Sequence, residues 1–317
     1  MSNDKQPRIL AAEPLALREA ARILRAGGLV AVPTETVYGL AARADSDAAV
    51  AAIYRAKGRP EFNPLIVHVA DMAAAQRMAH FDDRAIALAA RFWPGPLTLV
   101  LPRRKDAALA GAVTAGLPTV ALRCPAHAVM QALLAETGLA LAAPSANRSG
   151  AVSPTTAVHV AESLGGNIDL ILDGGACQQG IESSIVALRA TGGWQLLRPG
   201  PISPAGIATI LGTDSFGIRG RAGPIEAPGQ MPSHYAPGKP LRLNAVIAAS
   251  DEFHIGFGAV AGDVSLSHTA DMAEAAARLY ACLHAGAAAA QPRIAVAPVP
   301  AGGVGDAIND RLSRAAT

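Results

Sequence analysis

Short apolar segments, some separated by helical patterns and some in direct succession, constrain the fold of this chain most. Residues 29–32, 65–69, 96–101, 119–122, 139–142 and 170–172 are apolar runs bounded by Gly, Pro or polar residues, which predicts buried strands. Apolar periodicity predicts helices over residues 13–26, 47–57 and 127–136, and two more after Asp71 and Asp82. Because strands and helices alternate only in part, we expect an α/β layer fold with a mixed sheet.

The second half of the chain adds a hairpin, a change in composition and a further α/β pattern. Residues 184–188 and 194–197 predict paired strands, Ser153-Pro154 predicts a helix cap followed by Pro, and residues 203–211 predict a short helix. Between residues 217 and 240 there are five Gly and five Pro without apolar periodicity. Strand and helix patterns then resume. We therefore predict three parts: residues 1–213, a linker at 214–240, and a small α/β domain at 241–317.

Composition excludes several classes of protein. Hydrophobic residues make up 51% of the 317 residues and charged residues 16%, so the chain can build a core and is not disordered. No long apolar window predicts a membrane span, and the first residues lack a signal-peptide pattern. The three cysteines lack CxxC spacing, which favours neither disulfides nor a zinc site. These features predict a cytoplasmic protein.

Basic residues follow the predicted helix at 47–57. Lys57-Gly58-Arg59 allows two interpretations. Cations are favoured at a helix C-terminus, where Gly is a routine stop. A lysine and an arginine could equally clamp a polyphosphate, the lysine as a point charge and the arginine as a fork. The net charge of +2 is too small to predict nucleic-acid binding, but it permits a basic cluster inside a cleft.

Other polar residues follow predicted strands, where ligands collect in open α/β sheets. Residues 33–39 (PTETVYG) and 143–150 (APSANRSG) come directly after two apolar runs, and Arg123 and Arg198 end two others. Each segment could also be an ordinary polar turn. Ser145 lacks the surroundings of a nucleophile, and neither a Walker A nor a GxGxxG motif is present. A nucleotide would therefore be held by some other arrangement.

Taken together, these motifs resemble the YrdC-like threonylcarbamoyl-AMP synthase family in its longer, two-domain form. The matching segments are PTETVYGL (33–40), KGRP…NPLIVHV (57–69), WPGPLTLVL (93–101), ALRCPAH (121–127), APSANRSG (143–150), ESSIV (182–186), LLRPG (196–200), SHYAPGKPL (233–241) and GDAINDRLSRA (305–315). The resemblance covers nearly the whole chain. It implies a twisted mixed sheet with flanking helices and a basic cavity, followed by a small Rossmann-like α/β domain.

The resemblance also implies roles for individual residues. The family signature, a Lys-x-Arg with a later Ser-x-Asn, matches Lys57, Arg59, Ser145 and Asn147. The resemblance implies that these four residues are catalytic and line one basic cavity. Positions that surround L-threonine match Thr34, His68, Arg123, Ala143 and Ser183, with Arg123 on the carboxylate. Positions around the nucleotide match Arg59, Asn63, Thr119, Ser145, Ser153, Arg198 and Tyr235. The resemblance also implies that Mg²⁺ accompanies the triphosphate, without a metal ligand from the protein. The position of Tyr235 in the linker suggests a lid over the nucleotide.

The implied reaction joins L-threonine, bicarbonate or CO₂, and ATP into threonylcarbamoyl-AMP and pyrophosphate. The implied partners are proteins that transfer the threonylcarbamoyl group to tRNA. Two alternatives remain at this point. One is a carbamoyltransferase that makes carbamoyl-AMP, although such proteins carry zinc-finger and acylphosphatase-like domains for which 317 residues leave no room. The other is a non-catalytic RNA-binding module, which the low net charge disfavours.

Overall fold

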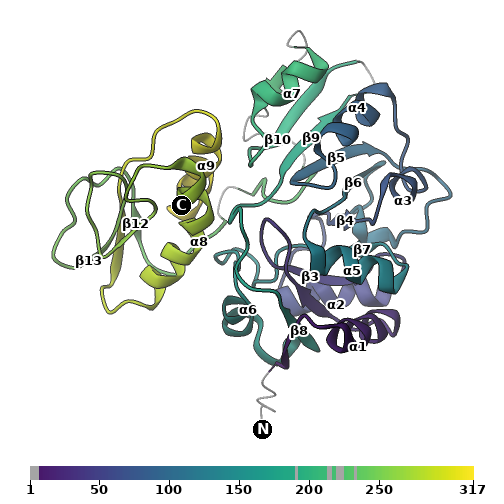
Figure 1. Cartoon of the computed structure of the whole chain (residues 1–317), viewed down its shortest axis with the longest axis horizontal. Helices are drawn as coiled ribbons and strands as arrows, with labels where there is room; N and C mark the ends of the chain where they lie inside the picture. Colours follow the sequence, from purple (N-terminus) through teal and green to yellow (C-terminus); the bar gives the residue numbers. More distant parts are fainter. Residues whose placement is uncertain (1–6, 190–191, 213–215, 219–224, 232–233) are drawn as a thin grey trace.

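The protein is described here by a computed structural model covering residues 7–189, 192–212, 216–218, 225–231 and 234–317. Within these residues, eleven strands form one sheet in the order β1-β8-β2-β3-β7-β4-β6-β5-β9-β10-β11 (Figure 1). The strands are β1 (Ile9–Ala11), β2 (Val30–Val32), β3 (Gly39–Arg43), β4 (Ile66–His68), β5 (Leu97–Pro102), β6 (Thr119–Arg123), β7 (Leu141–Ala142), β8 (Leu170–Asp173), β9 (Ser184–Leu188), β10 (Trp194–Arg198) and β11 (Phe216–Ile218). β4 pairs with β6 in parallel and with β7 antiparallel, so the predicted mixed sheet is confirmed.

Helices cover one face of this sheet completely and the other face only in part. The helices of this domain are α1 (Pro14–Arg25), α2 (Asp47–Lys57), α3 (Met72–Gln76), α4 (Asp83–Phe92), α5 (Ala128–Thr137), α6 (Ala157–Leu164) and α7 (Pro204–Leu211), with short 3₁₀ turns at Gly111–Val113 and Gly165–Asn167. The largest core cluster joins α2, α3, α4, α6 and α7 to one face. A second cluster joins α1 and α5 to the other face, over β2, β3, β7 and β8.

The linker covers a further part of that second face. Ala227 packs there with side chains of β4, β5, β6, β9 and β10 in a separate apolar cluster. Part of the predicted linker, residues 216–218, extends the sheet as β11 beside β10, which the sequence analysis did not anticipate. A segment with ten Gly and Pro residues lacks apolar periodicity, so sequence reasoning found no strand in it.

Most predicted elements agree with the structure, and two predictions are wrong. Ser153 does not cap a helix, because its hydroxyl is buried and bonded to Glu182; Thr156 caps α6 instead. The sequence pattern after the linker predicts a strand over residues 241–248, but the strand is limited to Leu241–Arg242, since Asn244 adopts a left-handed conformation that ends the extended chain. β1 and β3 were not predicted. No helix in the described parts of the chain is long and apolar enough to cross a membrane.

The C-terminal domain is the small α/β unit that its pattern predicts. Its four strands, in the order β12-β15-β13-β14, are parallel. They are β12 (Leu241–Arg242), β13 (Glu252–Gly256), β14 (Val264–Ser265) and β15 (Arg293–Val296), and the helices are α8 (Met272–Ala288) and α9 (Val304–Ala315). In Figure 1, α8 and α9 lie on the side of the small sheet that faces the larger domain. Val37, Val152 and Ile181 of the larger domain pack into the C-terminal core.

A glycine allows the closest approach between the two domains. Gly180 has a φ of +68°, and a Cβ built there would lie 2.4 Å from the carbonyl oxygen of Ala277 and 2.5 Å from that of Ala276, both in α8. A side chain at this position would have to displace helix backbone. The segment that leads from Gly180 to Glu182 is therefore packed directly on the C-terminal domain.

We predict that Gly180→Ala lowers the midpoint of thermal unfolding more than Gly116→Ala does. Gly116 has a φ of +78° and open space around a built Cβ, so it carries the same backbone strain without the clash. Overpacking costs about 1–3 kcal/mol in addition. Differential scanning calorimetry of both variants measures the difference, and equal shifts would contradict the close domain contact.

Candidate functional site

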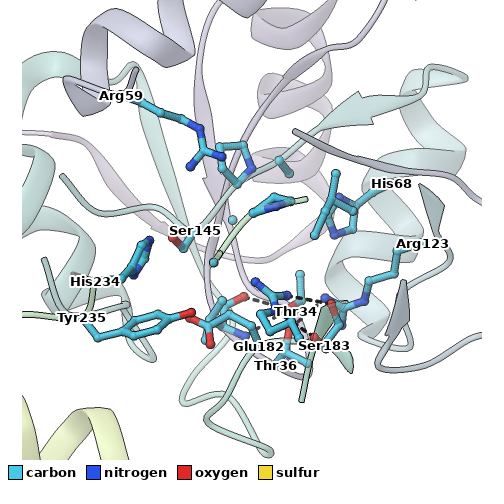
Figure 2. Close-up of a pocket in the computed structure, with 18 residues that line it drawn as sticks. Thr34, Thr36, Arg59, His68, Arg123, Ser145, Glu182, Ser183, His234 and Tyr235 are labelled. Atoms are coloured by element: carbon cyan, nitrogen blue, oxygen red, sulfur yellow. Dashed lines mark hydrogen bonds between the residues drawn. The ribbon is translucent and has the colours of Figure 1, made fainter. Parts of the chain in front are cut away.

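A cavity lies where several strands of the large sheet end, beside the part of the sheet that the linker covers (Figure 2). β4 ends at His68, β6 at Arg123 and β10 at Arg198, while the turns after β2 and β7 supply hydroxyl groups. The lining residues are Thr34, Thr36, Val37, Gly39, Arg59, Ile66, His68, Arg123, Ala143, Pro144, Ser145, Glu182, Ser183, Arg198, Pro228, Gly229, His234 and Tyr235. The cavity thus joins three strand ends to the linker.

One side of the cavity is built around Arg123. Its guanidinium donates to the Thr36 hydroxyl at 2.9 Å and to the carbonyl of Gly95 at 3.2 Å. Its Nη2 lies 2.7 Å from Glu35 Oε1, an ion pair of two buried side chains. The Thr34 and Thr36 hydroxyls are 2.8 Å apart. Despite its burial, Glu35 has a lowered carboxyl pKa because of the charge of Arg123. Arg123 is therefore fixed before any ligand arrives.

His68 and Ser183 complete this side. His68 is 2% exposed, and its Nδ1 has no hydrogen-bond partner among the described residues. Burial lowers the pKa of His68 to about 3, helped by the nearby Arg123, so the ring is neutral at pH 7. The Ser183 hydroxyl lies 2.8 Å from that of Thr98. These groups offer neutral hydrogen bonds next to a fixed cation, which suits a small zwitterion with a carboxylate.

Two more arginines line the rest of the cavity. Arg198 donates to the Ser183 carbonyl at 3.0 Å and to its hydroxyl at 3.1 Å. Arg59 donates to the carbonyls of Asn63 at 3.2 Å and Pro64 at 2.9 Å. Burial lowers the pKa of Arg59 to about 10, which leaves it charged at neutral pH. In Figure 2, Arg59 and Tyr235 lie on the opposite side of the cavity from Arg123.

Contrary to expectation, Lys57 and Asn147 do not line the cavity; both are buried and bond to the backbone of the loop that contributes to it. The Lys57 ammonium donates to the backbone carbonyls of Ser145 and Asn147. The Asn147 amide donates to the carbonyls of Arg148 and Ala151, each at 2.8 Å. The lysine thus ties the end of α2 to the loop after β7. The Lys-x-Arg and Ser-x-Asn segments of the signature are therefore brought together, but the contact runs from the Lys57 side chain to backbone carbonyls.

Three other residues that were predicted to bind the nucleotide do not line the cavity. The Asn63 amide contacts Met231 of the linker at 3.6 Å. Thr119 is half-buried at the start of β6, four residues before Arg123, and the Ser153 hydroxyl donates to Glu182 at 2.6 Å. Their predicted contacts with a nucleotide stay predictions. The other predicted residues, Thr34, Arg59, His68, Arg123, Ala143, Ser145, Ser183, Arg198 and Tyr235, all line the cavity.

Residues of the linker line one side of the cavity. Tyr235 is 1% exposed, with a hydroxyl that has no hydrogen-bond partner among the described residues. A Cβ built on Gly229, whose φ is +81°, would lie 2.9 Å from Arg198 Cδ and 3.2 Å from the Tyr235 hydroxyl. The cavity volume is about 40 Å³, room for a few waters since one needs about 10–15 Å³. A nucleotide is much larger than this volume.

Several residues that shape this site received no individual role from the sequence, although Glu35 and Thr36 belong to the polar segment at 33–39. Thr36 and Glu182 line the cavity, Glu35 pairs with Arg123, and Arg311 of α9 pairs with Glu182 at 3.0 Å. Thr36 and Glu35 stand beside Thr34, so adjacency was a usable signal. Arg311 lies far along the chain, and its spacing from Glu182 carries no information about contact.

We predict that the protein loses stability on acidification below pH 6.5. Burial lowers the pKa values of His68 and His234 to about 3. Between about pH 3 and 6.5 the unfolded chain therefore binds more protons, so stability rises with pH in this window. Each group contributes up to about 1.4 kcal/mol per pH unit.

Urea unfolding at pH 6.5 and 4.5 tests this assignment. His68→Gln should lose less stability between the two pH values than the wild type does. Replacing the exposed His268 by Gln is the control and should leave the difference unchanged. If His68→Gln lost as much stability between pH 6.5 and 4.5 as the wild type does, the His68 imidazole would not be held neutral in the folded protein.

Comparison with known proteins covers both parts of the chain. A family model described as telomere recombination (Sua5/YciO/YrdC) matches residues 22–200, and one described as threonylcarbamoyl-AMP synthase, C-terminal domain, matches residues 202–317. Threonylcarbamoyl-AMP synthase of Bacillus subtilis is 46% identical over 72% of this chain and 66% of its own length. That of Pyrococcus abyssi is 45% identical over 70% of this chain and 65% of its own length. These alignments thus span slightly less than two thirds of either relative.

The similarity extends to the three-dimensional structure. The crystal structure of P. abyssi Sua5 complexed with L-threonine superposes with a TM-score of 0.89 at 35% identity, covering 98% of this chain and 97% of that one. Both sheets and the helices between them are therefore arranged as in that protein. The chain belongs to the YrdC-like threonylcarbamoyl-AMP synthase family, in its two-domain form.

Proposed function

We propose that this protein is a threonylcarbamoyl-AMP synthase, a nucleotidyltransferase that condenses L-threonine, bicarbonate or CO₂, and ATP into threonylcarbamoyl-AMP and pyrophosphate. The observation that carries the proposal is a cavity with a fixed arginine on one side and two further arginines along the rest. Such a cavity suits two anionic reactants that must be held against each other. The sequence relatives and the threonine complex of P. abyssi Sua5 support the same assignment.

L-threonine fits the side built around Arg123. The guanidinium suits the amino-acid carboxylate, because Arg–carboxylate pairs form directed, charge-assisted hydrogen bonds. The hydroxyls of Thr34 and Ser183 and the backbone near Ala143 lie around the same space. His68 is neutral at pH 7, so it does not repel the ammonium group of the substrate. The amine must lose a proton before it captures CO₂ as a carbamate.

ATP fits the part of the cavity beside the linker. Arg59 and Arg198 supply cations for the phosphates, and Ser145 and Tyr235 supply hydroxyls. The carbamate oxygen attacks the α-phosphorus and pyrophosphate leaves. The protein contributes mainly position and charge, as phosphoryl-transfer sites do. Because linker residues line this part of the cavity, we propose that the linker acts as a lid that closes over the nucleotide and excludes water.

Mg²⁺ belongs to the substrate in this proposal. The carboxylates nearest the cavity are already paired, Glu182 with Arg311 and Glu35 with Arg123. We therefore propose that phosphate oxygens of ATP hold the ion. The product is a reactive mixed anhydride, which calls for partner proteins that move the threonylcarbamoyl group to tRNA in the cytoplasm. All three cysteines are buried and unpaired, which suits that compartment.

We predict that pyrophosphate release from ATP requires both threonine and bicarbonate. Arg123→Met should raise the KM for threonine at least tenfold, with a smaller change for ATP. Arg59→Ala and Lys57→Ala should lower the rate at least tenfold, the first by losing a phosphate contact and the second by releasing the loop at Ser145. Lost charge-assisted hydrogen bonds of about 1.5–3 kcal/mol account for these factors.

A coupled pyrophosphate assay with each substrate varied in turn measures these effects. Arg104→Met is the control, because Arg104 pairs with Asp106 on the surface of the same domain. A wild-type protein that binds RNA but releases no pyrophosphate would be a binding module. Wild-type rates for Arg59→Ala would refute the assigned phosphate contact.

The lid gives a separate prediction. Gly229→Ala places a methyl group against Arg198 and Tyr235, so the linker should close poorly, and the KM for ATP should rise at least fivefold. Gly238→Ala is the control in the same linker, since Gly238 has a similar φ of +76° with open space around it. Equal KM values for the two variants would contradict a lid at this position.

A further inference from the structure

A carboxylate stands on the wall of a cavity that we expect to hold anions. Glu182 lines the cavity and is 6% exposed. It carries a negative charge, because nearby arginines and hydrogen bonds hold the pKa of its carboxyl at about 2 in spite of burial. Left alone, this charge would repel both a triphosphate and an amino-acid carboxylate. The surrounding structure must therefore neutralise it.

The C-terminal domain supplies much of that neutralisation. Arg311 Nε of α9 donates to Glu182 Oε2 at 3.0 Å, and the Tyr280 hydroxyl of α8 donates to the same oxygen at 2.8 Å. Ser153 of the larger domain donates to Oε1 at 2.6 Å. Both oxygens of Glu182 are thus occupied, and the only formal positive charge among these three donors comes from the other domain.

Arg311 is built into the domain boundary. Its side chain is fully buried at 0% exposure and also donates to the carbonyl of Pro199 at 2.7 Å, in the turn after β10. It lies 3.0 Å from Asp310 as well, a carboxylate that has a second partner in Arg314, so two arginines balance Glu182 and Asp310. The Arg311 guanidinium lies 5.6 Å from the centre of the Tyr235 ring, which also stacks on Tyr280 with the ring centres 5.5 Å apart. One arginine therefore contacts a cavity wall, the end of a cavity-forming strand and the linker.

The charge of a second arginine, Arg198, also acts on the Glu182 carboxylate. Arg198 lowers the pKa of the Glu182 carboxyl by its charge, after the larger effect of Arg311. The guanidinium of Arg198 is nevertheless bonded to the neighbouring Ser183 and lines the cavity. If Arg311 were absent, Glu182 would still be influenced by the charge of Arg198, and Arg198 would have less charge to offer a phosphate.

We propose that Arg311 is a positioning residue of the site: the C-terminal domain provides the counter-charge of Glu182 and so leaves Arg198 free to bind the phosphates of the nucleotide. This inference rests on the proposed function, because it assumes that a nucleotide binds beside Arg198. It gives the C-terminal domain a specific role, which is to complete the electrostatics of a cavity that lies in the other domain. Arg311 itself does not line the cavity.

The decisive variant is Arg311→Met, which removes the charge and keeps apolar contact with the Tyr235 ring. The ligands are L-threonine and a Mg²⁺-bound ATP analogue whose α,β-bridging oxygen is replaced by methylene, each titrated by calorimetry into the full-length protein. We expect the Kd of the analogue to rise at least tenfold and that of threonine to change less than threefold. An unchanged Kd for the analogue, or a parallel rise for both ligands, would overturn the proposal.

The double variant Glu182→Gln/Arg311→Met separates charge from packing. With the carboxylate gone, Arg198 has no competing anion, so the Kd of the analogue should return to within threefold of wild type. If the Kd of the analogue stayed raised in the double variant, Arg311 would not act by balancing the charge of Glu182. Arg293→Met is the matched control, since Arg293 pairs with Asp251 on the surface of the same domain, with side chains 46% and 48% exposed; both Kd values should stay unchanged.

Two further measurements keep the test decisive. If Arg311→Met is insoluble, the double variant and Arg311→Lys, which keeps the charge, should each bind the analogue within threefold of wild type, and a tenfold loss in either would overturn the proposal. The wild type is titrated first. A wild type that binds neither ligand would refute the proposed function, whereas a wild type that binds both while Arg311→Met behaves identically would refute only this inference.

Discussion

Both faces of a buried sheet must be covered, and the unequal covering of this sheet determines where the site lies. Helices pack along one face, but α1 and α5 cover only part of the other. Beyond them, the linker packs Ala227 on the apolar surface of β4, β5, β6, β9 and β10. A covering segment without helical structure can leave the sheet at lower cost than a packed helix. The same constraint therefore places the cavity beside the linker, which is the segment that we propose as a lid.

Buried charge is the second constraint, because an unpaired charge in a closed cavity is costly. Among the described residues, three arginines line this cavity, and each is anchored. Glu35 holds Arg123, and backbone carbonyls hold Arg59 and Arg198. Carbonyl anchoring holds a guanidinium in place without cancelling its charge. It leaves Arg59 and Arg198 suited to phosphates, while the fixed Arg123 suits a single small carboxylate.

The two domains share one polar network across their boundary. Glu182 comes from the larger domain, while Arg311 and Tyr280 come from the smaller one. Gly180 permits the close packing that brings α8 to this segment. A cavity in one domain is thus completed by side chains of another, and the linker between them carries Tyr235 into the same network.

The sequence by itself determined the class of the fold, most of its elements and the polar segments at the strand ends. Apolar periodicity and caps are local, so α2 and its Gly58 stop could be predicted with the bounds that the structure has. The resemblance named residues such as Arg123 and Arg198, which do line the cavity. Tertiary structure alone decided that Lys57 holds a backbone loop, that Ser153 bonds Glu182 rather than capping a helix, and that Arg311 reaches Glu182. These contacts join residues that are distant in sequence. They form only when the helices, strands and loops pack together, and no local sequence pattern encodes that packing.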